Sequence, residues 1–205
     1  MRIAYFASGS GSTFQFLVES ARTEQLPCDH ALLICSNMNA FALSRARELD
    51  VPAEVIRRRD FPSPVEHGQA LLKALRTAQC DAICLCGFLE LIPPAVVQAY
   101  RNKIVNIHPA LLPAFGGHGM YGKRVHEAVL QYGARITGAT VHFVDEEYDH
   151  GPVIAQIPVR VDPADTPDSL AARVQAAEKN LYFGALRLLV RDRLRIHDRI
   201  VTILP

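Results

Sequence analysis

An amide and an imidazole stand two positions apart at the end of a short apolar run in this sequence. Residues 103–105 read Lys-Ile-Val, and Asn106 and His108 follow them. Because side chains alternate along a β-strand, Asn106 and His108 should point to the same side of the backbone. An amide donates hydrogen bonds without titrating, whereas an imidazole exchanges protons near neutral pH. The pair therefore suits a site that holds a polar group and moves a proton.

The strand that carries this pair should end near His108, because Pro109 has no backbone donor for a sheet ladder. Open α/β sheets bind their ligands beyond the carboxyl ends of the strands, so the pair would face such a position. The alternative is structural: a core histidine bonded to a backbone carbonyl, beside an asparagine that begins a turn. The two residues by themselves leave both interpretations open.

A loop rich in glycine and serine follows the first predicted strand. Residues 2–7 form an apolar strand, residues 8–13 read Ser-Gly-Ser-Gly-Ser-Thr, and a helix opens at Phe14. Strand, loop and helix in this order can hold a phosphate with backbone amides at a helix N-terminus. The loop matches neither the P-loop nor the dinucleotide-binding pattern, which argues against a triphosphate or a dinucleotide. The alternative is a plain tight turn with a serine or threonine cap.

The segment after the fourth predicted strand, residues 81–86, is apolar although it should form a loop. Residues 87–94 read Gly-Phe-Leu-Glu-Leu-Ile-Pro-Pro. Beside the ligand-binding edge of a sheet, such a loop could line a pocket for a flat ring. Packing beneath the next helix is an equally good interpretation.

The order of the predicted elements indicates an α/β protein with an open, twisted, mostly parallel sheet. Five strands alternate with helices through the first half, which favours right-handed βαβ units. Residues 137–145 and 153–161 are β-rich runs joined by a turn at 148–152, and they should pair as an antiparallel C-terminal extension. A long helix over 166–191 and a short strand or hairpin over 195–204 complete the chain.

Length and composition narrow the function further. With 205 residues and no repeat or linker, the chain should form one domain over 1–205, with halves at 1–100 and 101–205. The net charge of +1 argues against non-specific nucleic-acid binding, and no apolar run approaches a membrane span of about 20 residues. The lack of a leader pattern and the five cysteines, an odd number, predict a cytoplasmic protein with reduced thiols and no metal site.

Three segments together resemble a known family. Residues 106–113 read Asn-Ile-His-Pro-Ala-Leu-Leu-Pro, residues 140–144 read Thr-Val-His-Phe-Val, and residues 149–152 read Asp-His-Gly-Pro. In this combination they resemble the folate-dependent formyltransferases, and the resemblance covers essentially the whole chain. It implies the Rossmann-like formyltransferase fold, with a phosphate-binding first half and a catalytic and folate-binding second half. The chain departs from frequent family residues at Pro64 and His118, where arginine and lysine are common.

The resemblance implies transfer of a formyl group in de novo purine biosynthesis. In the implied reaction, the amine of glycinamide ribonucleotide attacks the formyl carbon of 10-formyltetrahydrofolate, and a tetrahedral oxyanion collapses to release tetrahydrofolate. By carry-over, Asn106, His108 and Asp149 are the catalytic residues. Asn106 would donate to the oxyanion, His108 would stabilise that charge and move a proton, and Asp149 would orient or charge His108. The reaction requires neither a nucleophilic side chain nor a metal.

The resemblance also implies which residues bind the two substrates. The phosphate of the ribonucleotide would contact Gly11, Ser12 and Thr13 in the loop, with Gln175 and Glu178 on the last long helix. The formyl folate, which is a co-substrate, would contact Phe88, Leu89, Leu91, Ile92, Asp145, Glu146, Glu147 and Tyr148. We expect these two small molecules as partners, no nucleic acid or membrane, and a monomer or homodimer.

Two other functions share this fold. A formyltetrahydrofolate deformylase would use water in place of the amine, and a non-catalytic nucleotide-binding protein would carry out no reaction. Deformylases of this type usually carry an additional N-terminal domain, whereas the first strand here begins at residue 2. Binding alone would not require Asn106, His108 and Asp149 together. Asp149 could instead be only the hydrogen-bonding residue of its turn.

Overall fold

The chain forms two compact units, residues 1–106 and 107–205. The computed structural model describes all 205 residues. The boundary between the units falls after Asn106, inside a strand. The expected single domain with halves at 1–100 and 101–205 stays a prediction.

The strands of the first unit form a parallel sheet. They are β1 (Arg2–Ala7), β2 (Asp29–Cys35), β3 (Ala53–Val55), β4 (Ala82–Leu85) and the first residues of β5 (Ile104–His108). Their order is β3-β2-β1-β4-β5, and every neighbouring pair is parallel. The carboxyl ends of these strands therefore meet at one edge, where Ser8 follows β1 and Asn106 pairs with Leu85. The predicted mostly parallel sheet is confirmed.

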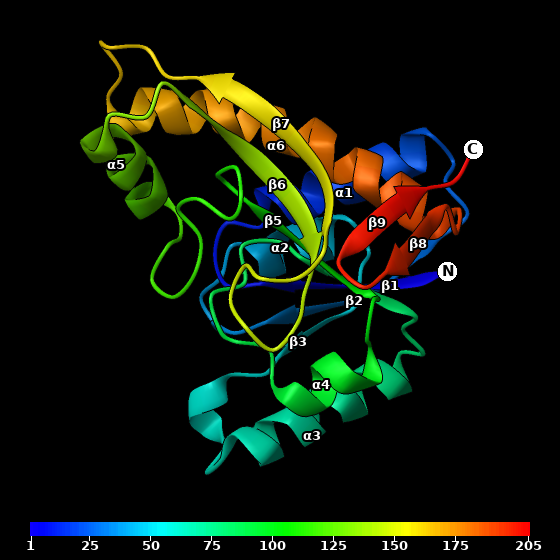
Figure 1. Cartoon of the computed structure of the whole chain (residues 1–205). Helices are drawn as coiled ribbons and strands as arrows, with labels where there is room; N and C mark the ends of the chain where they lie inside the picture. The colour runs from blue at the N-terminus through cyan, green and yellow to red at the C-terminus, as the bar shows by residue number, and fades with distance from the viewer. The chain divides into compact units, whose positions relative to one another are not determined.

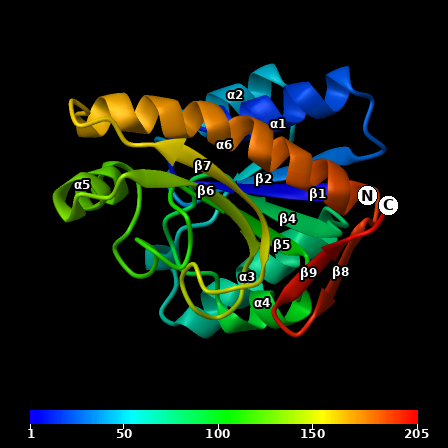
Figure 2. The same cartoon turned by 45° about the horizontal axis from the view of Figure 1, so that its top comes forward.

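The helices of the first unit cover both faces of its strands. They are α1 (Ser12–Thr23), α2 (Ala42–Glu48), α3 (Pro64–Thr77) and α4 (Pro94–Ala99), with a short 3₁₀ helix, η1, at Arg58–Asp60. α1 and α2 lie on one face, and α3 and α4 on the other (Figure 2). Because both faces are covered there, the inner strands β1 and β4 are apolar and almost wholly buried, whereas the residues of the edge strand β3 are exposed. The predicted start of α3 is confirmed, since the Ser63 side chain accepts a hydrogen bond from the Glu66 amide at 3.2 Å.

The second unit is built on an antiparallel pair. β6 (Ile136–Phe143) pairs with β7 (Val153–Arg160) from Ile136↔Arg160 onward, as predicted. The remaining elements are α5 (Lys123–Tyr132), α6 (Pro167–Val190) and a hairpin of β8 (Leu194–His197) and β9 (Ile200–Ile203). α6 runs along β6 and β7, and the β8–β9 hairpin is the last element of the chain (Figure 1).

A compact apolar core joins these elements of the second unit. Val125 and Val129 of α5, Ala139 of β6, and Leu170 and Val174 of α6 are all buried in it. α6 begins with a capping box that the sequence did not predict in full, in which the side chains and backbones of Thr166 and Ser169 bond reciprocally. Two of the elements flanking the site, β6 and α5, are therefore held by packing as well as by backbone bonds.

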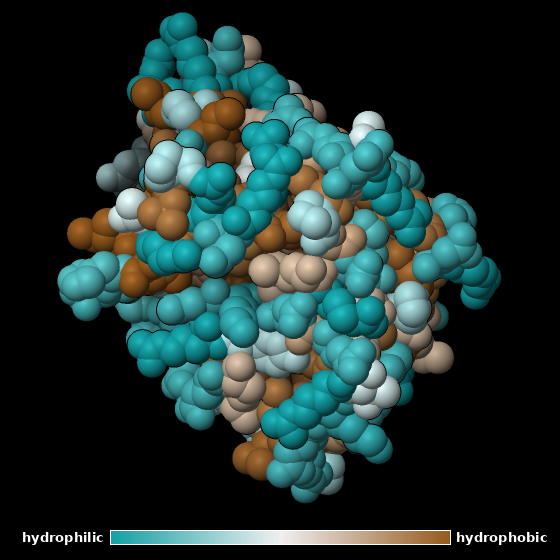
Figure 3. All heavy atoms as spheres, turned by 90° about the vertical axis from the view of Figure 1, so that its right-hand side faces the viewer, coloured by the Kyte–Doolittle hydropathy of each residue, from teal (hydrophilic) through white to brown (hydrophobic).

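The surface is mixed in character. Figure 3 draws the face that carries the β8–β9 hairpin, where hydrophilic side chains predominate and apolar patches lie between them. No helix has the length and apolar character that crossing a membrane requires. All five cysteines are free, as predicted; Cys28 is half-buried, and Cys35, Cys80, Cys84 and Cys86 are buried.

Candidate active site

The imidazole of His108 faces the carboxylate of Asp149. His108 ends β5, and its Nδ1 lies 3.3 Å from Asp149 Oδ2. The two side chains are only 4% and 10% exposed. Asn106 lies two residues earlier in the same strand and is half-buried, so the period of the strand turns it to the side of His108. The predicted end of the strand at His108 is confirmed, and the distant residue Asp149 does return to it.

Both ring nitrogens of His108 face oxygen acceptors. Nε2 lies 2.8 Å from the carbonyl oxygen of Phe115, which can only accept, so Nε2 carries a proton. Nδ1 faces the Asp149 carboxylate, which also accepts. The ring is therefore held on both sides, by a backbone carbonyl oxygen at Nε2 and by the Asp149 carboxylate at Nδ1.

Asp149 is surrounded by groups that favour its charged form. Burial alone would raise the pKa of Asp149, but hydrogen bonds from His108 and His142, the charge of His108 and the Gly117 amide together hold that pKa well below its usual range. Gly117 donates to Oδ2 at 3.0 Å, and His142 Nε2 lies 3.7 Å from Oδ1. The carboxylate is thus ionised at neutral pH and acts by its charge more than as a base.

Two tight backbone segments bring these groups together. Phe115 and Asp149 both have positive φ, 55° and 54°, a conformation that non-glycine residues rarely adopt. Gly116, the residue after Phe115, lies close against Asp149, since a Cβ there would meet Asp149 Cβ at 3.2 Å and Leu112 Cδ2 at 2.5 Å. Gly151 packs its Cα against the end of β6, where a Cβ would lie 1.9 Å from the Phe143 oxygen. The glycine in the predicted Gly-Pro turn is therefore required by close approach.

A buried threonine holds the loop that follows His108. The hydroxyl of Thr140 donates to the Ala110 oxygen at 2.7 Å and accepts from the Leu112 amide at 3.0 Å. Gln156 of β7 donates to the same hydroxyl at 2.9 Å and to the Leu112 oxygen at 3.0 Å. These bonds tie the loop to β6 and β7. Thr140 and His142 belong to a segment that carries the family resemblance, but sequence reasoning assigned neither of them a role; the two share one face of β6 by their spacing.

Glu178 of α6 lies close enough to His108 for that residue to influence the pKa of the Glu178 carboxyl. Burial raises the pKa of Glu178 to about 7, and the charge of His108 opposes that rise. Burial likewise lowers the pKa of His126 on α5, and His108 lowers it further. A carboxylate repels a phosphate, so of the two α6 residues Gln175, which is exposed, is the better phosphate donor. The phosphate-binding roles of Gln175 and Glu178 stay predictions.

The loop predicted to bind phosphate ends in a glycine at the N-cap of α1. The alternative interpretation of this loop required a serine or threonine cap there. α1 begins at Ser12, earlier than predicted, and its N-cap is Gly11 with φ 71° and no capping side chain. The capping alternative is therefore wrong, and the first amides of α1 have no partner within the helix. A Cβ on Gly11 would lie 2.6 Å from Ala42 Cβ, so any larger residue there strains the fold as well.

An arginine that sequence reasoning missed lies beside this loop. Arg45 of α2 donates from Nε to the Ser10 oxygen at 2.9 Å, and its guanidinium lies 4.9 Å from the ring centre of Phe41. A fixed positive charge at the start of a helix suits an anionic ligand. The sequence did not predict the contact between Arg45 and Ser10, because this contact depends on how α2 packs beside the loop.

The apolar loop after β4 is partly packed and partly exposed. The ring of Phe88 packs edge-on against the ring of Phe6 in β1, with 5.2 Å between the ring centres, and Ile92 is buried. Leu89 and Leu91 are 53% and 43% exposed. The Leu89 amide donates to Ser8 Oγ at 2.9 Å, which ties this loop to the start of the glycine- and serine-rich loop. Phe88 and Ile92 fit the packing interpretation of the loop, whereas a pocket lined by Leu89 and Leu91, and any contact with folate, stay predictions.

The predicted folate-binding residues of the second unit lie in the turn that carries Asp149. The carboxylate of Asp145 accepts from the Glu147 amide at 3.0 Å and from His150 Nδ1 at 2.7 Å. Tyr148 is 38% exposed and contacts the ring of His118 at 5.7 Å between centres. The direct contacts of Asp145, Glu146, Glu147 and Tyr148 with folate stay predictions, but Asp145 clearly shapes the turn.

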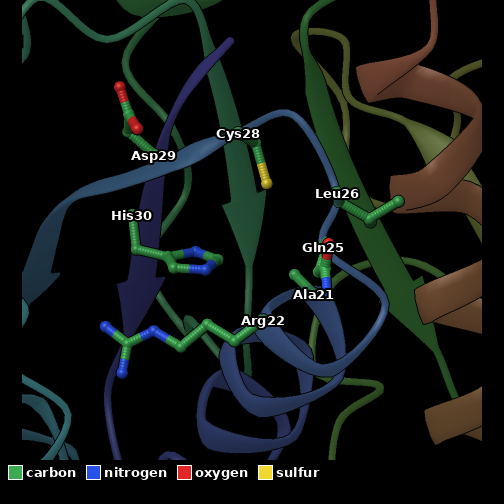
Figure 4. Close-up of a pocket in the computed structure, with 7 residues that line it drawn as sticks. All are labelled: Ala21, Arg22, Gln25, Leu26, Cys28, Asp29 and His30. Atoms are coloured by element: carbon green, nitrogen blue, oxygen red, sulfur yellow. The ribbon is translucent and has the colours of Figure 1, made fainter.

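A separate hollow of about 290 Å³ lies at the other edge of the first unit's strands. It is lined by Ala21, Arg22, Gln25, Leu26, Cys28, Asp29 and His30. Figure 4 shows the imidazole of His30 between the side chains of Cys28 and Arg22. Because Asp29 begins β2, this hollow lies opposite the loop after β1, and none of the predicted site residues lines it. No group of three or more His, Cys, Asp or Glu side chains is arranged to hold a metal ion.

The fold and the site define a class of protein. Residues 1–186 match the model of the formyl transferase family, and the chain belongs to this family.

Its relatives narrow the comparison. The chain is 41% identical over 195 residues to the chloroplastic phosphoribosylglycinamide formyltransferase of Arabidopsis thaliana, which covers 95% of this chain and 67% of the relative. It is 34% identical to phosphoribosylglycinamide formyltransferase of Bacillus subtilis, over 92% of this chain and 94% of that one. The solved glycinamide ribonucleotide transformylase 1 of Symbiobacterium toebii is similar in fold, with a TM-score of 0.94, 36% identity and 100% and 94% of the two chains covered.

Proposed function

We propose that this chain transfers the formyl group of 10-formyltetrahydrofolate to the amine of glycinamide ribonucleotide. The products are formylglycinamide ribonucleotide and tetrahydrofolate, in a step of de novo purine biosynthesis. The observation that carries the proposal is the buried His108–Asp149 pair at 3.3 Å, with Asn106 two residues earlier in β5. The names of the relatives support the same substrates.

Each residue of the trio has a role that its surroundings support. Asn106 donates a hydrogen bond to the oxyanion that forms when the amine attacks the formyl carbon. His108 stabilises the same oxygen and can pass a proton to the leaving nitrogen of the folate. Asp149 orients His108 and places a negative charge beside its ring; as a base Asp149 is weak, because its pKa is held well below the usual range. No enzyme nucleophile takes part in this scheme.

The substrates would use the sites that the resemblance implies. The phosphate of the ribonucleotide sits on the amides of Gly11, Ser12 and Thr13 at the start of α1, a position favoured by the helix dipole. The exposed Leu89 and Leu91 offer apolar surface for the pteridine of the formyl folate. The formyl folate is a co-substrate, and the scheme needs no metal. We further propose a cytoplasmic monomer or homodimer that binds neither nucleic acid nor a membrane.

An absorbance assay of folate turnover tests this function. Purified protein is incubated with 10-formyltetrahydrofolate, with and without glycinamide ribonucleotide, and the Asp149→Asn variant serves as the inactive control. We expect turnover only when the ribonucleotide is present. Equal turnover in water alone would assign a deformylase, and binding of the ribonucleotide without turnover would assign a non-catalytic binding protein.

A further inference from the structure

The turn that carries Asp149 has a strained backbone that its own residues do not fully explain. Asp149 has a φ of 54°, and the next residues, His150 and Gly151, lead directly into β7. Aspartate tolerates this conformation better than most residues but does not prefer it. The position of the Asp149 carboxylate against His108 therefore depends on contacts that keep the turn in this shape.

An arginine from the C-terminal hairpin holds the residue that follows Asp149. Arg199 donates from Nη2 to the carbonyl oxygen of His150 at 2.5 Å, and its Nη1 lies 3.3 Å from His150 Nε2. On the other side of the ring, His150 Nδ1 lies 2.7 Å from Asp145 Oδ2. Arg199 thus contacts both the backbone and the side chain of His150.

The donors and acceptors around the His150 ring are consistent with one tautomer. A guanidinium only donates, so Nε2 of His150 must accept, and a carboxylate only accepts, so Nδ1 must carry the proton. The neutral ring with its proton on Nδ1 satisfies both partners. Asp145, His150 and Arg199 then form a continuous chain of hydrogen bonds that spans the turn from its first residue to its end.

The hairpin that presents Arg199 is well anchored. β8 and β9 pair from Leu194↔Ile203 to His197↔Ile200, which leaves Asp198 and Arg199 as the two-residue tip. Asp198 has a φ of 55°, and the Leu204 amide closes the open end of the hairpin on the Arg193 oxygen at 2.8 Å. The tip lies beside the loop between β6 and β7 in both ribbon views (Figures 1 and 2).

We propose that Arg199 is a positioning residue, which acts through His150 to hold the Asp149 carboxylate in register with His108. The proposal rests on the function proposed above for the same site. His150 is 51% exposed at its side chain, and exposed polar pairs of this kind add little to folding stability. The contacts with Arg199 are therefore better suited to setting local geometry than to stabilising the fold.

The test compares two arginines of the same hairpin. Arg199→Ala removes both contacts with His150, whereas Arg195→Ala removes contacts only with Asp192 and Leu194, near the base of the hairpin. We expect Arg199→Ala to lower kcat for formyl transfer about tenfold, because small displacements of a catalytic group are costly. The KM for each substrate and the melting temperature should stay close to those of the wild type. Arg199→Lys should restore part of kcat, since one ammonium can bond the carbonyl but cannot reach both acceptors as a fork.

A second measurement reports the position of Asp149 without activity. The Gly117 amide donates to Asp149 Oδ2 at 3.0 Å, so its ¹H–¹⁵N NMR signal should shift in Arg199→Ala and stay in place in Arg195→Ala. An unchanged kcat together with an unchanged Gly117 signal would overturn the proposal. So would a loss confined to the KM for folate, which would make Arg199 a binding residue, or an equal loss in Arg195→Ala. If the wild type transferred no formyl group, the proposed function would fail, while the Gly117 signal would still decide whether Arg199 positions Asp149.

Discussion

The Asp149 carboxylate lies between two imidazoles, and His142 is the one to which sequence reasoning assigned no role. His142 Nε2 lies 3.7 Å from Oδ1, while the other oxygen faces His108 at 3.3 Å. At 3.7 Å the His142 contact is the longer and weaker of the two. One negative charge therefore serves two rings, and its removal should affect the whole site.

The first prediction concerns this charge. Asp149→Asn keeps an oxygen that can accept from Gly117, so the turn should persist, but the negative charge beside His108 is lost. We expect kcat to fall by about 10²–10⁴ with little change in the circular dichroism spectrum. Asp168→Asn, which removes an exposed charge paired with Lys123 at 2.8 Å, is the control and should be fully active. An active Asp149→Asn variant would reduce Asp149 to a turn residue.

The second prediction concerns Asn106, the uncharged member of the proposed catalytic trio. Asn106→Ala removes the amide that we assign to the oxyanion and should lower kcat by about 10²–10³, the usual loss for one such donor. Asn106 is half-buried, so thermal unfolding should shift little. Near-normal turnover, or a variant that fails to fold, would point instead to the structural interpretation of this residue.

The third prediction concerns the pH dependence of stability at Glu178. Burial raises the folded-state pKa of Glu178 to about 7, above the unfolded value of about 4.3, so the folded protein binds the extra proton between these values. Its contribution to stability is therefore full below about pH 4 and is lost as the pH rises toward 7. Glu178→Gln should unfold at a higher temperature than the wild type at pH 8, and the difference should vanish near pH 4.

Thermal melts at both pH values, with the exposed Glu127→Gln on α5 as the matched control, measure this effect. A Glu178→Gln variant that is less stable than the wild type at pH 8 would mean that the charged carboxylate has a favourable partner in the folded protein.

The fourth prediction uses two threonines of one strand. Thr140 is fully buried, and its hydroxyl bonds Ala110, Leu112 and Gln156. Thr140→Val leaves these partners unpaired in the interior and should lower the free energy of unfolding by about 2–3 kcal/mol. It should also lower kcat, because the loop after His108 loses its support.

The matched control for this change is Thr137→Val. Thr137 lies in the same strand and is 2% exposed, but its hydroxyl has no partner, so the same substitution should be neutral or stabilising. Urea unfolding of both variants measures the difference. Equal losses would show that packing of the threonine methyl, and not the hydroxyl, decides stability at these positions.

The parts of the site that could be predicted depend on local rules. Side-chain alternation and the missing donor of Pro109 placed Asn106 and His108 at a strand end, and both rules act within a few residues. The return of Asp149 was predicted from the resemblance, because nothing near Asp149 in the sequence specifies its neighbour. The Gly-Pro turn only made such a return possible.

The parts that were missed depend on long-range contacts or on signals that are absent. The N-cap of α5 is Gly122, which has a φ of 55° and no capping side chain, so the sequence carries no helix-start signal there. Gly11 likewise takes the place of a side-chain cap on α1. Thr140 and His142 acquire their roles only from what packs against β6, which periodicity does not reveal.

The distribution of the cysteines makes the unaltered protein convenient for spectroscopy. Four thiols are buried, and only Cys28 is partly accessible, at the hollow beside His30 and opposite the loop after β1. Burial raises the pKa of the Cys28 thiol, so a maleimide dye should attach there slowly, and faster in mildly alkaline buffer than at neutral pH. A fluorophore or spin label could thus be carried at one site, without engineering, while the residues proposed for catalysis remain untouched.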